Sequence, residues 1–330
     1  MQPRPVIAVV GPTSSGKSAL AVRLARRFNG EIISADSRQV YHGLDIGSGK
    51  ITKREMKGIP HYLLDVVRPQ RTFTVAQYQK LARRVLEDIV RRGRMPIVCG
   101  GTGFYIDALR GHISLPSVPP NPKSRIKLEK LSTEKLGEKL KVLDRKRFEN
   151  IDLKNRRRLI RAIEIAVFQK GSTFLPQGRT LTCGWSKDGP CWLILGIKLE
   201  PTELKRKINA RLKSRLRCGL IAEVRKLHEN GVSWRRLDEL GLEYRYAAKL
   251  LREQERDFRD ASEPVSRRVK REGIAFLEKQ LAIATWHYAK RQMTWFKRDQ
   301  TIQWVKNYKE AERLTVAFLR KSGKITRAKD

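Results

Sequence analysis

Residues 5–28, from Pro5 to Phe28, read PVIAVVGPTSSGKSALAVRLARRF. The β-branched run Val6–Val10 predicts a short buried strand, and the apolar residues between Lys17 and Phe28 recur at helical spacing. Between these two segments, GPTSSGKS matches the pattern GxxxxGK[ST] at every fixed position. A strand, a glycine-rich loop and a helix in this order predict a phosphate-binding loop.

The loop has the chemistry that a phosphate chain requires. Its glycines allow several backbone N–H groups to converge on phosphate oxygens, and the helix N-terminus adds a favourable dipole. The Lys17 side chain supplies a positive charge, and the Ser18 hydroxyl is the natural ligand for Mg²⁺. We assign phosphate contacts to the whole loop: Gly11, Pro12, Thr13, Ser14, Ser15, Gly16, Lys17 and Ser18.

The alternation of strands and helices continues after the loop. Further buried strands are predicted at Glu31–Ser34, Met95–Gly101 and Cys191–Leu199, with a helix at Gln77–Arg92. Strands that alternate with helices of this length favour an α/β fold with a parallel sheet.

The composition changes at residues 114–123, where four prolines mark a boundary. We expect an α/β core at residues 1–115, to which the chain returns near 190–212 and 285–320. A mainly helical insertion is expected at 116–189 and about 213–284. On a long helix near the end, one apolar stripe is predicted, formed by Ile274, Leu277, Leu281, Ala284 and Tyr288.

The charge of the chain is unusual. Lys and Arg number 71 against 34 Asp and Glu, which gives a net charge of +37. Such an excess favours a polyanionic partner, nucleic acid before membrane, although a highly charged proteome or thermal adaptation remains an alternative. The four cysteines are scattered without a CxxC pair, and no apolar segment is long enough for a signal peptide or a membrane span. We therefore expect a cytoplasmic protein with reduced thiols and no membrane attachment.

A carboxylate that an ATP-dependent enzyme of this class uses is missing. Such enzymes carry an Asp at the end of a hydrophobic strand to hold Mg²⁺. Here the strand at residues 95–101 ends in Cys-Gly-Gly, followed by Thr102, and no NKxD motif for guanine occurs. The loop thus indicates a phosphate chain but not ATP. A P-loop small-molecule kinase using ATP and a non-enzymatic RNA-binding P-loop protein both remain alternatives.

A different carboxylate, Asp36, follows the second strand. If that strand lies beside the first, Asp36 sits at the same carboxyl edge of the sheet as the loop, where α/β sites form. It would suit Mg²⁺ binding or proton abstraction, or it could cap a turn. The next residues, Ser37, Arg38 and Gln39, bring groups that read base edges and phosphates.

Seven segments together resemble one family. They are GPTSSGKS, SADSRQVY, DIGSGK, HYLLDV, IVCGGTGFYIDAL, NRRRLIRAIEI and AKRQMTWF, spread from residue 11 to residue 296. In this order they closely resemble bacterial tRNA dimethylallyltransferases, also called isopentenyl-tRNA transferases. The resemblance implies a P-loop NTPase-like parallel sheet with a mainly helical insertion.

The resemblance also implies a reaction. A dimethylallyl group passes from dimethylallyl diphosphate to the exocyclic amine (N6) of the adenosine 3′-adjacent to the anticodon, position 37 of tRNA. The loop would then hold the donor diphosphate, with Mg²⁺ at Ser18, and Asp36 would remove the amine proton. Thr102 matches a family threonine beside the reacting centre, although a capping role after the glycine turn is an alternative.

Further residues are placed by the same resemblance. In KINARLKSRL, Lys207 and Arg211 match a basic pair, and Arg211 is the expected diphosphate ligand. The segment Lys290–Gln292 could contact diphosphate or RNA, or brace the core against Trp295. We assign contacts with the tRNA anticodon stem-loop to eight residues: Asp36, Ser37, Arg38, Gln39, Asn155, Arg157, Arg158 and Arg161. A solvated basic helix face is the alternative for the last four, and a monomer is expected.

The chain departs from the family pattern at two places. Lys207 stands where Arg is commoner. The segment GLEYRYAAKLL, residues 241–251, resembles the family's Gly-Tyr-Lys-Glu segment only loosely, so no role is assigned to it.

Overall fold

The computed structural model describes residues 4–113, 115–116, 118–171, 189–260 and 267–324. Its contacts divide the chain into two compact units. One comprises Met1–Arg110 and Trp185–Asp330, and the other comprises Gly111–Gly184. Cys183 lies outside the described residues.

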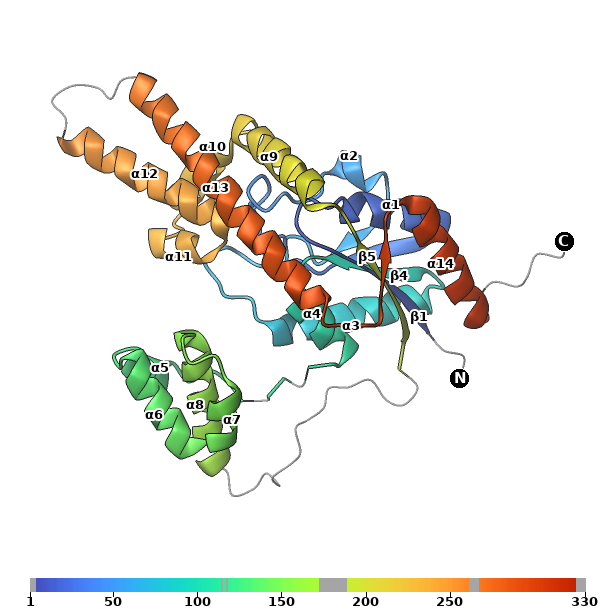
Figure 1. Cartoon of the computed structure of the whole chain (residues 1–330), viewed down its shortest axis with the longest axis horizontal. Coiled ribbons are helices and arrows are strands. Elements are labelled where there is room, and N and C mark those ends of the chain that lie inside the picture. Colours follow the sequence, from blue (N-terminus) through green and yellow to red (C-terminus); the bar gives the residue numbers. More distant parts are fainter. Residues whose placement is uncertain (1–3, 114, 117, 172–188, 261–266, 325–330) are drawn as a thin grey trace. The chain divides into compact units, whose positions relative to one another are not determined.

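The larger unit is built on a six-stranded sheet (Figure 1). Its strands are β1 (Pro5–Val10), β2 (Gly30–Ser34), β3 (His61–Tyr62), β4 (Met95–Gly100), β5 (Cys191–Ile197) and β6 (Ile302–Val305). All pair in parallel in the order β3-β2-β4-β1-β5-β6. The predicted parallel α/β fold is confirmed. The sequence patterns did not predict β3 and β6, because segments of two and four residues carry too little periodicity.

The order of the strands differs from one expectation. The strand before Asp36, β2, does not lie beside β1, because β4 pairs with both and separates them. The end of β2 still reaches the end of β4, where Ser34 is in register with Cys99. Since all these strands are parallel, Asp36 remains at the carboxyl edge that carries the loop after β1.

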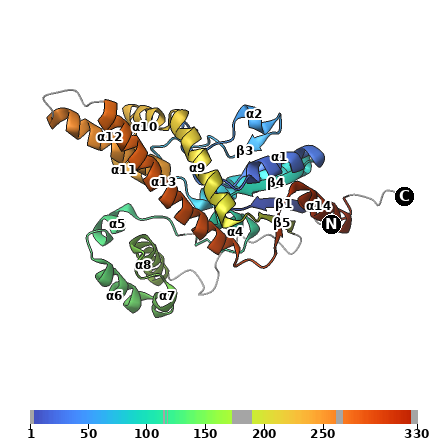
Figure 2. The same ribbon diagram turned by 45° about the horizontal axis from the view of Figure 1, so that its top comes forward.

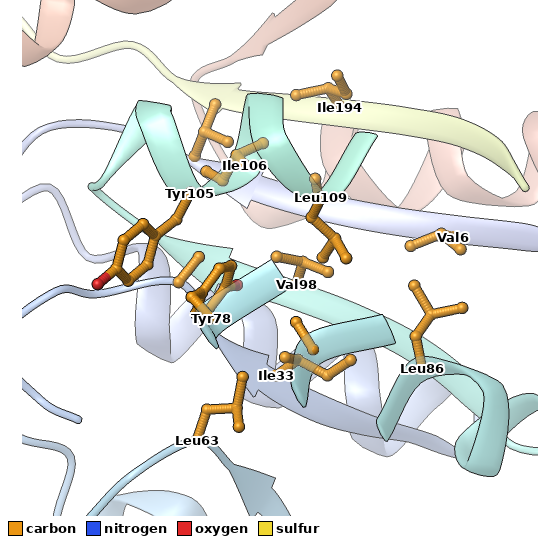
Figure 3. Packing of buried hydrophobic residues seen from close by; sticks show 14 of the residues in the cluster. Val6, Ile33, Leu63, Tyr78, Leu86, Val98, Tyr105, Ile106, Leu109 and Ile194 are labelled. Carbon is orange, nitrogen blue, oxygen red and sulfur yellow. The ribbon is translucent and has the colours of Figure 1, made fainter. Parts of the chain in front are cut away.

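Helices cover both faces of this sheet. Alternate residues of β1 point to opposite sides, with Val6 and Ala8 packing under one layer and Ile7 and Val9 under the other. The first layer contains α3 (Val75–Arg91) and α4 (Gly103–Arg110), and the second contains α1 (Lys17–Arg27) and α14 (Tyr308–Lys321). Figure 3 shows the first layer, in which the rings of Tyr78 and Tyr105 stack with centroids 4.1 Å apart.

A helical group of the same unit packs around a third core. It comprises α9 (Pro201–Arg217), α10 (Leu220–Glu229), α11 (Trp234–Glu239), α12 (Leu242–Asp260) and α13 (Arg267–Phe296). Figures 1 and 2 show α12 and α13 side by side, with α13 running on toward α4. The short α2 (Lys53–Met56) begins at a capping box formed by Thr52 and Glu55.

The apolar stripe on α13 is only partly as predicted. Leu277 and Leu281 are buried, but Ile274 and Tyr288 are exposed. The buried face continues through Thr285, Ala289, Gln292 and Phe296. Apolar periodicity did not predict this continuation, because two of its buried positions, Thr285 and Gln292, are polar.

The smaller unit is a helical group with its own core. It contains α5 (Pro122–Leu128), α6 (Thr133–Leu143), α7 (Arg145–Asn150) and α8 (Arg156–Gly171). Leu136, Leu140, Leu159 and Ile163 are buried together inside it. A buried carboxylate, Glu164, accepts hydrogen bonds from the Arg125 guanidinium at 2.7 and 2.8 Å. The tRNA-binding role of this unit and of residues 213–284 stays a prediction.

Among the described residues, no helix combines the length and the apolar character that crossing a membrane would need.

Candidate active site

The loop between β1 and α1 folds as its glycines require. Gly11 and Gly16 have φ values of 152° and 90°, and Ser14 also adopts a positive φ of 62°. The Ser15 N–H donates to the Pro12 carbonyl at 3.3 Å, which closes the turn before α1 begins at Lys17. The Ser15 hydroxyl is buried and has no hydrogen-bond partner among the described residues. A buried polar group without a partner is costly, so an anion at this loop would satisfy it.

Three cations from distant parts of the chain gather at the loop. The Lys17 ammonium donates to the Pro12 carbonyl at 3.3 Å, and the Arg211 guanidinium donates to the Gly49 carbonyl at 3.0 Å. Arg215, one turn further along α9, forms an ion pair with Glu243 at 2.5 Å. No carboxylate in the described part of the chain lies within 4.0 Å of the charged nitrogens of Lys17 or Arg211.

The electrostatics of these cations favour a bound anion. Burial lowers the pKa of Lys17, and the charges of Arg211 and Arg215 lower it further against the opposite effect of Cys99 and Asp36. Burial, followed by the like charge of Arg215, lowers the pKa of Arg211 to about 10. Desolvated cations that repel one another gain most from a multiply charged anion.

The carboxylate and the threonine lie together at the ends of β2 and β4. One oxygen of Asp36, Oδ1, accepts the N–H groups of Arg38 at 2.8 Å and Gln39 at 3.3 Å. The other oxygen, Oδ2, has no hydrogen-bond donor among the residues that the structure describes. The Thr102 hydroxyl accepts the Ser37 N–H at 3.1 Å, and its own N–H donates to the Ala35 carbonyl at 3.2 Å. Asp36 therefore caps a turn with one oxygen and keeps the other available.

Arg38 and Gln39 extend this edge. The Gln39 amide donates to the Gly49 carbonyl at 3.3 Å, the oxygen that Arg211 also contacts. The Arg38 side chain passes beside Gly241, where a Cβ would lie 3.6 Å from its Nε. The structure thus brings the phosphate loop, Arg211, Asp36, Thr102 and the Ser37–Gln39 segment to one edge.

The last residue of β4 before the glycines, Cys99, lies below this edge. Burial raises the pKa of Cys99 to about 11, while Lys17 and the Ser18 hydroxyl act in the opposite direction. A small cavity behind the loop is lined by Ser18, Cys99, Gln39 and His61, among others. The thiol stays protonated at neutral pH and is no nucleophile.

Sequence reasoning missed two tyrosines beside the carboxylate. Desolvation raises the pKa of both Tyr105 and Tyr288, although Tyr288 as a whole residue is 36% exposed, and the charge of Asp36 contributes in each case. Tyr105 comes from α4, and Tyr288 comes from α13, where it was assigned to an apolar stripe. No local pattern marks either residue, because α4 and α13 both lie far from Asp36 in the chain.

The other predicted tRNA contacts lie in the smaller unit. Asn155 precedes α8 and accepts the Arg158 N–H at 3.2 Å. Arg161 is engaged inside the unit, because it donates to the Val118 carbonyl at 2.6 Å and pairs with Glu164 at 3.3 Å. Arg157 and Arg158 have exposed side chains. Replacing Arg161 would therefore disturb the fold as well as any surface.

Comparisons with known proteins agree with one another. The family model described as IPP transferase matches residues 39–299. A tRNA dimethylallyltransferase 2 from Trichlorobacter lovleyi is 41% identical over 305 residues, 91% of each chain. A tRNA dimethylallyltransferase from Anoxybacillus flavithermus is 36% identical over 307 residues, covering 91% of this chain and 89% of the relative.

Solved structures give the same result. The full-length tRNA isopentenylpyrophosphate transferase of Bacillus halodurans superposes with a TM-score of 0.66 at 30% identity, covering 98% of this chain and 99% of that one. A eukaryotic dimethylallyltransferase, solved in the course of acting on tRNA, shares the fold with a TM-score of 0.72 at 21% identity. Since the family model covers most of the chain and the relatives align over nearly their whole length, the protein belongs to the IPP transferase family, whose curated members here are tRNA dimethylallyltransferases.

Proposed function

We propose that the protein transfers the dimethylallyl group of dimethylallyl diphosphate to N6 of the adenosine that follows the anticodon, position 37 of tRNA, and releases diphosphate. One observation carries the proposal. Beside the phosphate loop lie two cations, Lys17 and Arg211, that have no carboxylate partner within the described residues, and the same sheet edge holds Asp36, whose Oδ2 accepts no hydrogen bond from those residues. The names of the relatives support this function over an ATP-dependent kinase, and β4 ends without the Asp that such a kinase would use.

The donor would bind by its diphosphate. The backbone N–H groups at the start of α1, the buried Ser15 hydroxyl and the Lys17 ammonium supply donors on one side. Arg211 supplies a guanidinium that has no carboxylate partner within the described residues. A diphosphate that receives these charges becomes a better leaving group, because negative charge grows on it as the bond to carbon breaks.

The donor set at this edge fits a magnesium ion. Mg²⁺ prefers hydroxyl, carboxylate and phosphate oxygens, and usually binds through one or two protein groups together with the substrate. The Ser18 hydroxyl would hold it together with the diphosphate, since Ser18 lies where the loop turns into α1. When bound, the ion would offset the negative charge on the diphosphate.

The acceptor would react as a nitrogen nucleophile. The exocyclic amine of adenine is weakly nucleophilic because its lone pair is delocalised into the ring. As its nitrogen bonds to the dimethylallyl carbon that carries the diphosphate, the bond from that carbon to the diphosphate oxygen breaks. The diphosphate leaves with the electron pair. The surplus proton on nitrogen passes to Oδ2 of Asp36, the oxygen that accepts no hydrogen bond from the described residues. The Thr102 hydroxyl, held by the Ser37 N–H, would orient the amine or the diphosphate.

The RNA would be held by the basic surface. The net charge of +37 supports a polyanionic partner. The exposed Arg157 and Arg158 in the smaller unit and Arg38 at the sheet edge are the contacts that we propose for the anticodon stem-loop. The target adenosine must leave its stack to reach Asp36, at a cost of a few kcal/mol. We further expect a single chain to suffice, acting in the cytoplasm.

One assay tests the proposal. The protein is incubated with labelled dimethylallyl diphosphate, Mg²⁺ and unmodified tRNA, and in parallel with ATP as the control donor. The label should enter RNA without ATP, and nuclease digestion followed by chromatography should locate it on the adenosine after the anticodon. Consumption of ATP without alkylated adenosine would contradict the proposal, and retention of RNA without transfer would indicate a binding protein.

A further inference from the structure

A buried glutamine on α13 joins the two loops of the candidate site. Gln292 is only 7% exposed. Its Oε1 accepts the N–H of Thr13 in the phosphate loop at 2.8 Å. Its Nε2 donates to the carbonyl of Gly101, in the turn after β4, also at 2.8 Å. The two partners need opposite ends of the amide, so the pair of bonds determines its orientation.

Each bond holds a segment with a part in the proposed reaction. Thr13 lies in the middle of the phosphate loop, and its N–H points to Gln292 rather than to a ligand. Gly101 immediately precedes Thr102, whose hydroxyl accepts the Ser37 N–H beside Asp36. One side chain therefore links the donor loop to the edge that holds the acceptor groups.

The packing around Gln292 leaves little freedom. A Cβ added at Gly101 would lie 2.4 Å from Nε2 of Gln292. One turn further along α13, Trp295 presses on Gly103 so closely that a Cβ there would lie 2.2 Å from its Cδ1. The Trp295 indole N–H also donates to Asp107 at 2.8 Å. The end of α13 thus sits against the turn after β4 in a single register.

We infer that Gln292 is a positioning residue, which sets the distance between the donor diphosphate and the Asp36–Thr102 edge. The inference rests on the proposed function. A displacement needs the attacking nitrogen about 3–3.5 Å from the carbon, and a misplacement of about 1 Å can slow a reaction roughly a hundredfold. Because the Gln292 amide comes from α13, a helix outside both segments maintains the spacing between the phosphate loop and the turn after β4.

The test uses full-length protein and single-turnover kinetics with both substrates saturating. Gln292→Met keeps the volume and removes both hydrogen bonds, whereas Gln292→Asn keeps an amide that is too short to reach both partners. The control is Thr294→Ala on the same helix, because Thr294 is exposed and, among the described residues, its hydroxyl donates a hydrogen bond only to the Lys290 carbonyl of its own helix. Affinity for pyrophosphate and the melting temperature are measured on every variant.

We expect Gln292→Met to lower the single-turnover rate constant about 10- to 100-fold and Gln292→Asn about 3- to 10-fold. Pyrophosphate affinity should stay within about threefold of the unaltered protein, since no bond to the ligand is removed, and Thr294→Ala should match it. A purely structural role would lower the melting temperature and the reaction amplitude but leave the rate constant unchanged, which would overturn the inference. A loss confined to pyrophosphate affinity would overturn it too. Absence of transfer by the unaltered protein would instead count against the proposed function.

Discussion

Two glycine-rich loops of the larger unit, at residues 11–18 and 45–50, differ in the groups that accept hydrogen bonds from their backbone N–H groups. The loop at residues 45–50 reads DIGSGK. Its successive N–H groups from Asp45, Ile46 and Gly47 all donate to the carboxylate of Glu223, at 3.0, 2.7 and 3.0 Å. The Ser48 N–H donates to the hydroxyl of Tyr244 at 3.0 Å.

The phosphate loop at residues 11–18 has a different surrounding. The Thr13 N–H is taken by Gln292, but the buried Ser15 hydroxyl has no partner in the described part of the chain. The nearby Lys17 and Arg211 are without a carboxylate there. A composition rich in Gly and Ser therefore does not identify an anion site by itself. What distinguishes the two loops is that α10 supplies an internal anion to one of them.

The loop at residues 45–50 also supports a cation beside the phosphate loop. Its Gly49 carbonyl accepts hydrogen bonds from both Arg211 and Gln39, at 3.0 and 3.3 Å. A Cβ at Gly47 would lie 2.5 Å from the Tyr244 ring, so the loop packs tightly against α12. The carboxylate of Glu223 thus holds in place the loop that directs Arg211.

The largest expected effect concerns Asp36, the carboxylate at the same sheet edge as the phosphate loop. Asp36→Asn should slow the single-turnover chemical step by about 10²-fold or more, because general-base catalysis is worth roughly 10²–10⁴-fold. The tRNA dissociation constant should change little. If tRNA binding falls strongly while the rate constant at saturation holds, Asp36 acts in recognition instead.

A second test removes the carboxylate of Glu223 from the loop at residues 45–50. Glu223→Ala should destabilise the protein by about 3 kcal/mol, because three backbone N–H groups and the Tyr244 hydroxyl lose a charged acceptor. Urea unfolding measures this change. Activity should fall as well, since the Gly49 carbonyl would no longer be held. The exposed Glu229, at the end of the same helix, offers a control in Glu229→Ala, which should change stability by less than about 0.5 kcal/mol.

A third test removes Arg211, a cation near the phosphate loop that has no carboxylate partner within the described residues. Arg211→Gln should raise the melting temperature of the free protein by about 2 °C, because a desolvated charge that Lys17 and Arg215 repel is lost. The stabilisation that pyrophosphate brings should shrink at the same time. A lower melting temperature with an unchanged pyrophosphate effect would show that the contact with Gly49 is the main role of Arg211.

The pKa of Arg211 gives this test a pH dependence. Burial lowers it to about 10 from the ordinary 12.5. Below pH 10 the folded protein carries the charge, so its cost to stability is fully present there and is relieved as the pH rises above 10. Pyrophosphate affinity should accordingly fall as the pH rises from 9 to 11 in the unaltered protein, and less so in Arg211→Gln. Isothermal titration calorimetry at constant ionic strength measures the difference.

The smallest effect belongs to the exposed arginines of the smaller unit. Arg158→Ala should weaken tRNA binding modestly and reduce the slope of log K against log salt by about 1, as expected for the loss of one phosphate contact. Arg161→Ala is the comparison, because Arg161 pairs with Glu164 and should mainly lower stability. An unchanged salt slope in Arg158→Ala would leave that residue as part of a solvated helix face.

The sequence predicts those parts of the fold and site that local patterns encode. The run before Gly11, the loop itself and the buried segments β4 and β5 have clear periodicity or spacing, and the structure has strands where they were expected. Asp36 was found because it follows a strand of a parallel sheet. The sequence left the neighbour of that strand open, because the pairing of β4 between β1 and β2 depends on the tertiary fold.

The supporting contacts lay beyond such patterns. Glu223 contacts a loop 176–178 residues earlier in the chain, and Gln292 contacts Thr13 across 279 residues. Each lies on a helix that carries other polar or charged residues, such as Lys226 on α10 and Thr294 on α13. Nothing within one turn of either helix indicates that its partner is a backbone N–H group elsewhere, so only the folded chain identifies them.

The strand order has a consequence for the time course of synthesis. The central strand β1 pairs on one side with β5, which starts at Cys191, and the edge strand β6 ends at Val305. Residues 111–184, with a core of their own, leave the ribosome before either strand. We therefore expect the smaller helical unit to fold before β5 and β6 have been synthesised. The contacts that Arg211 and Gln292 make near the phosphate loop should form only near the end of translation.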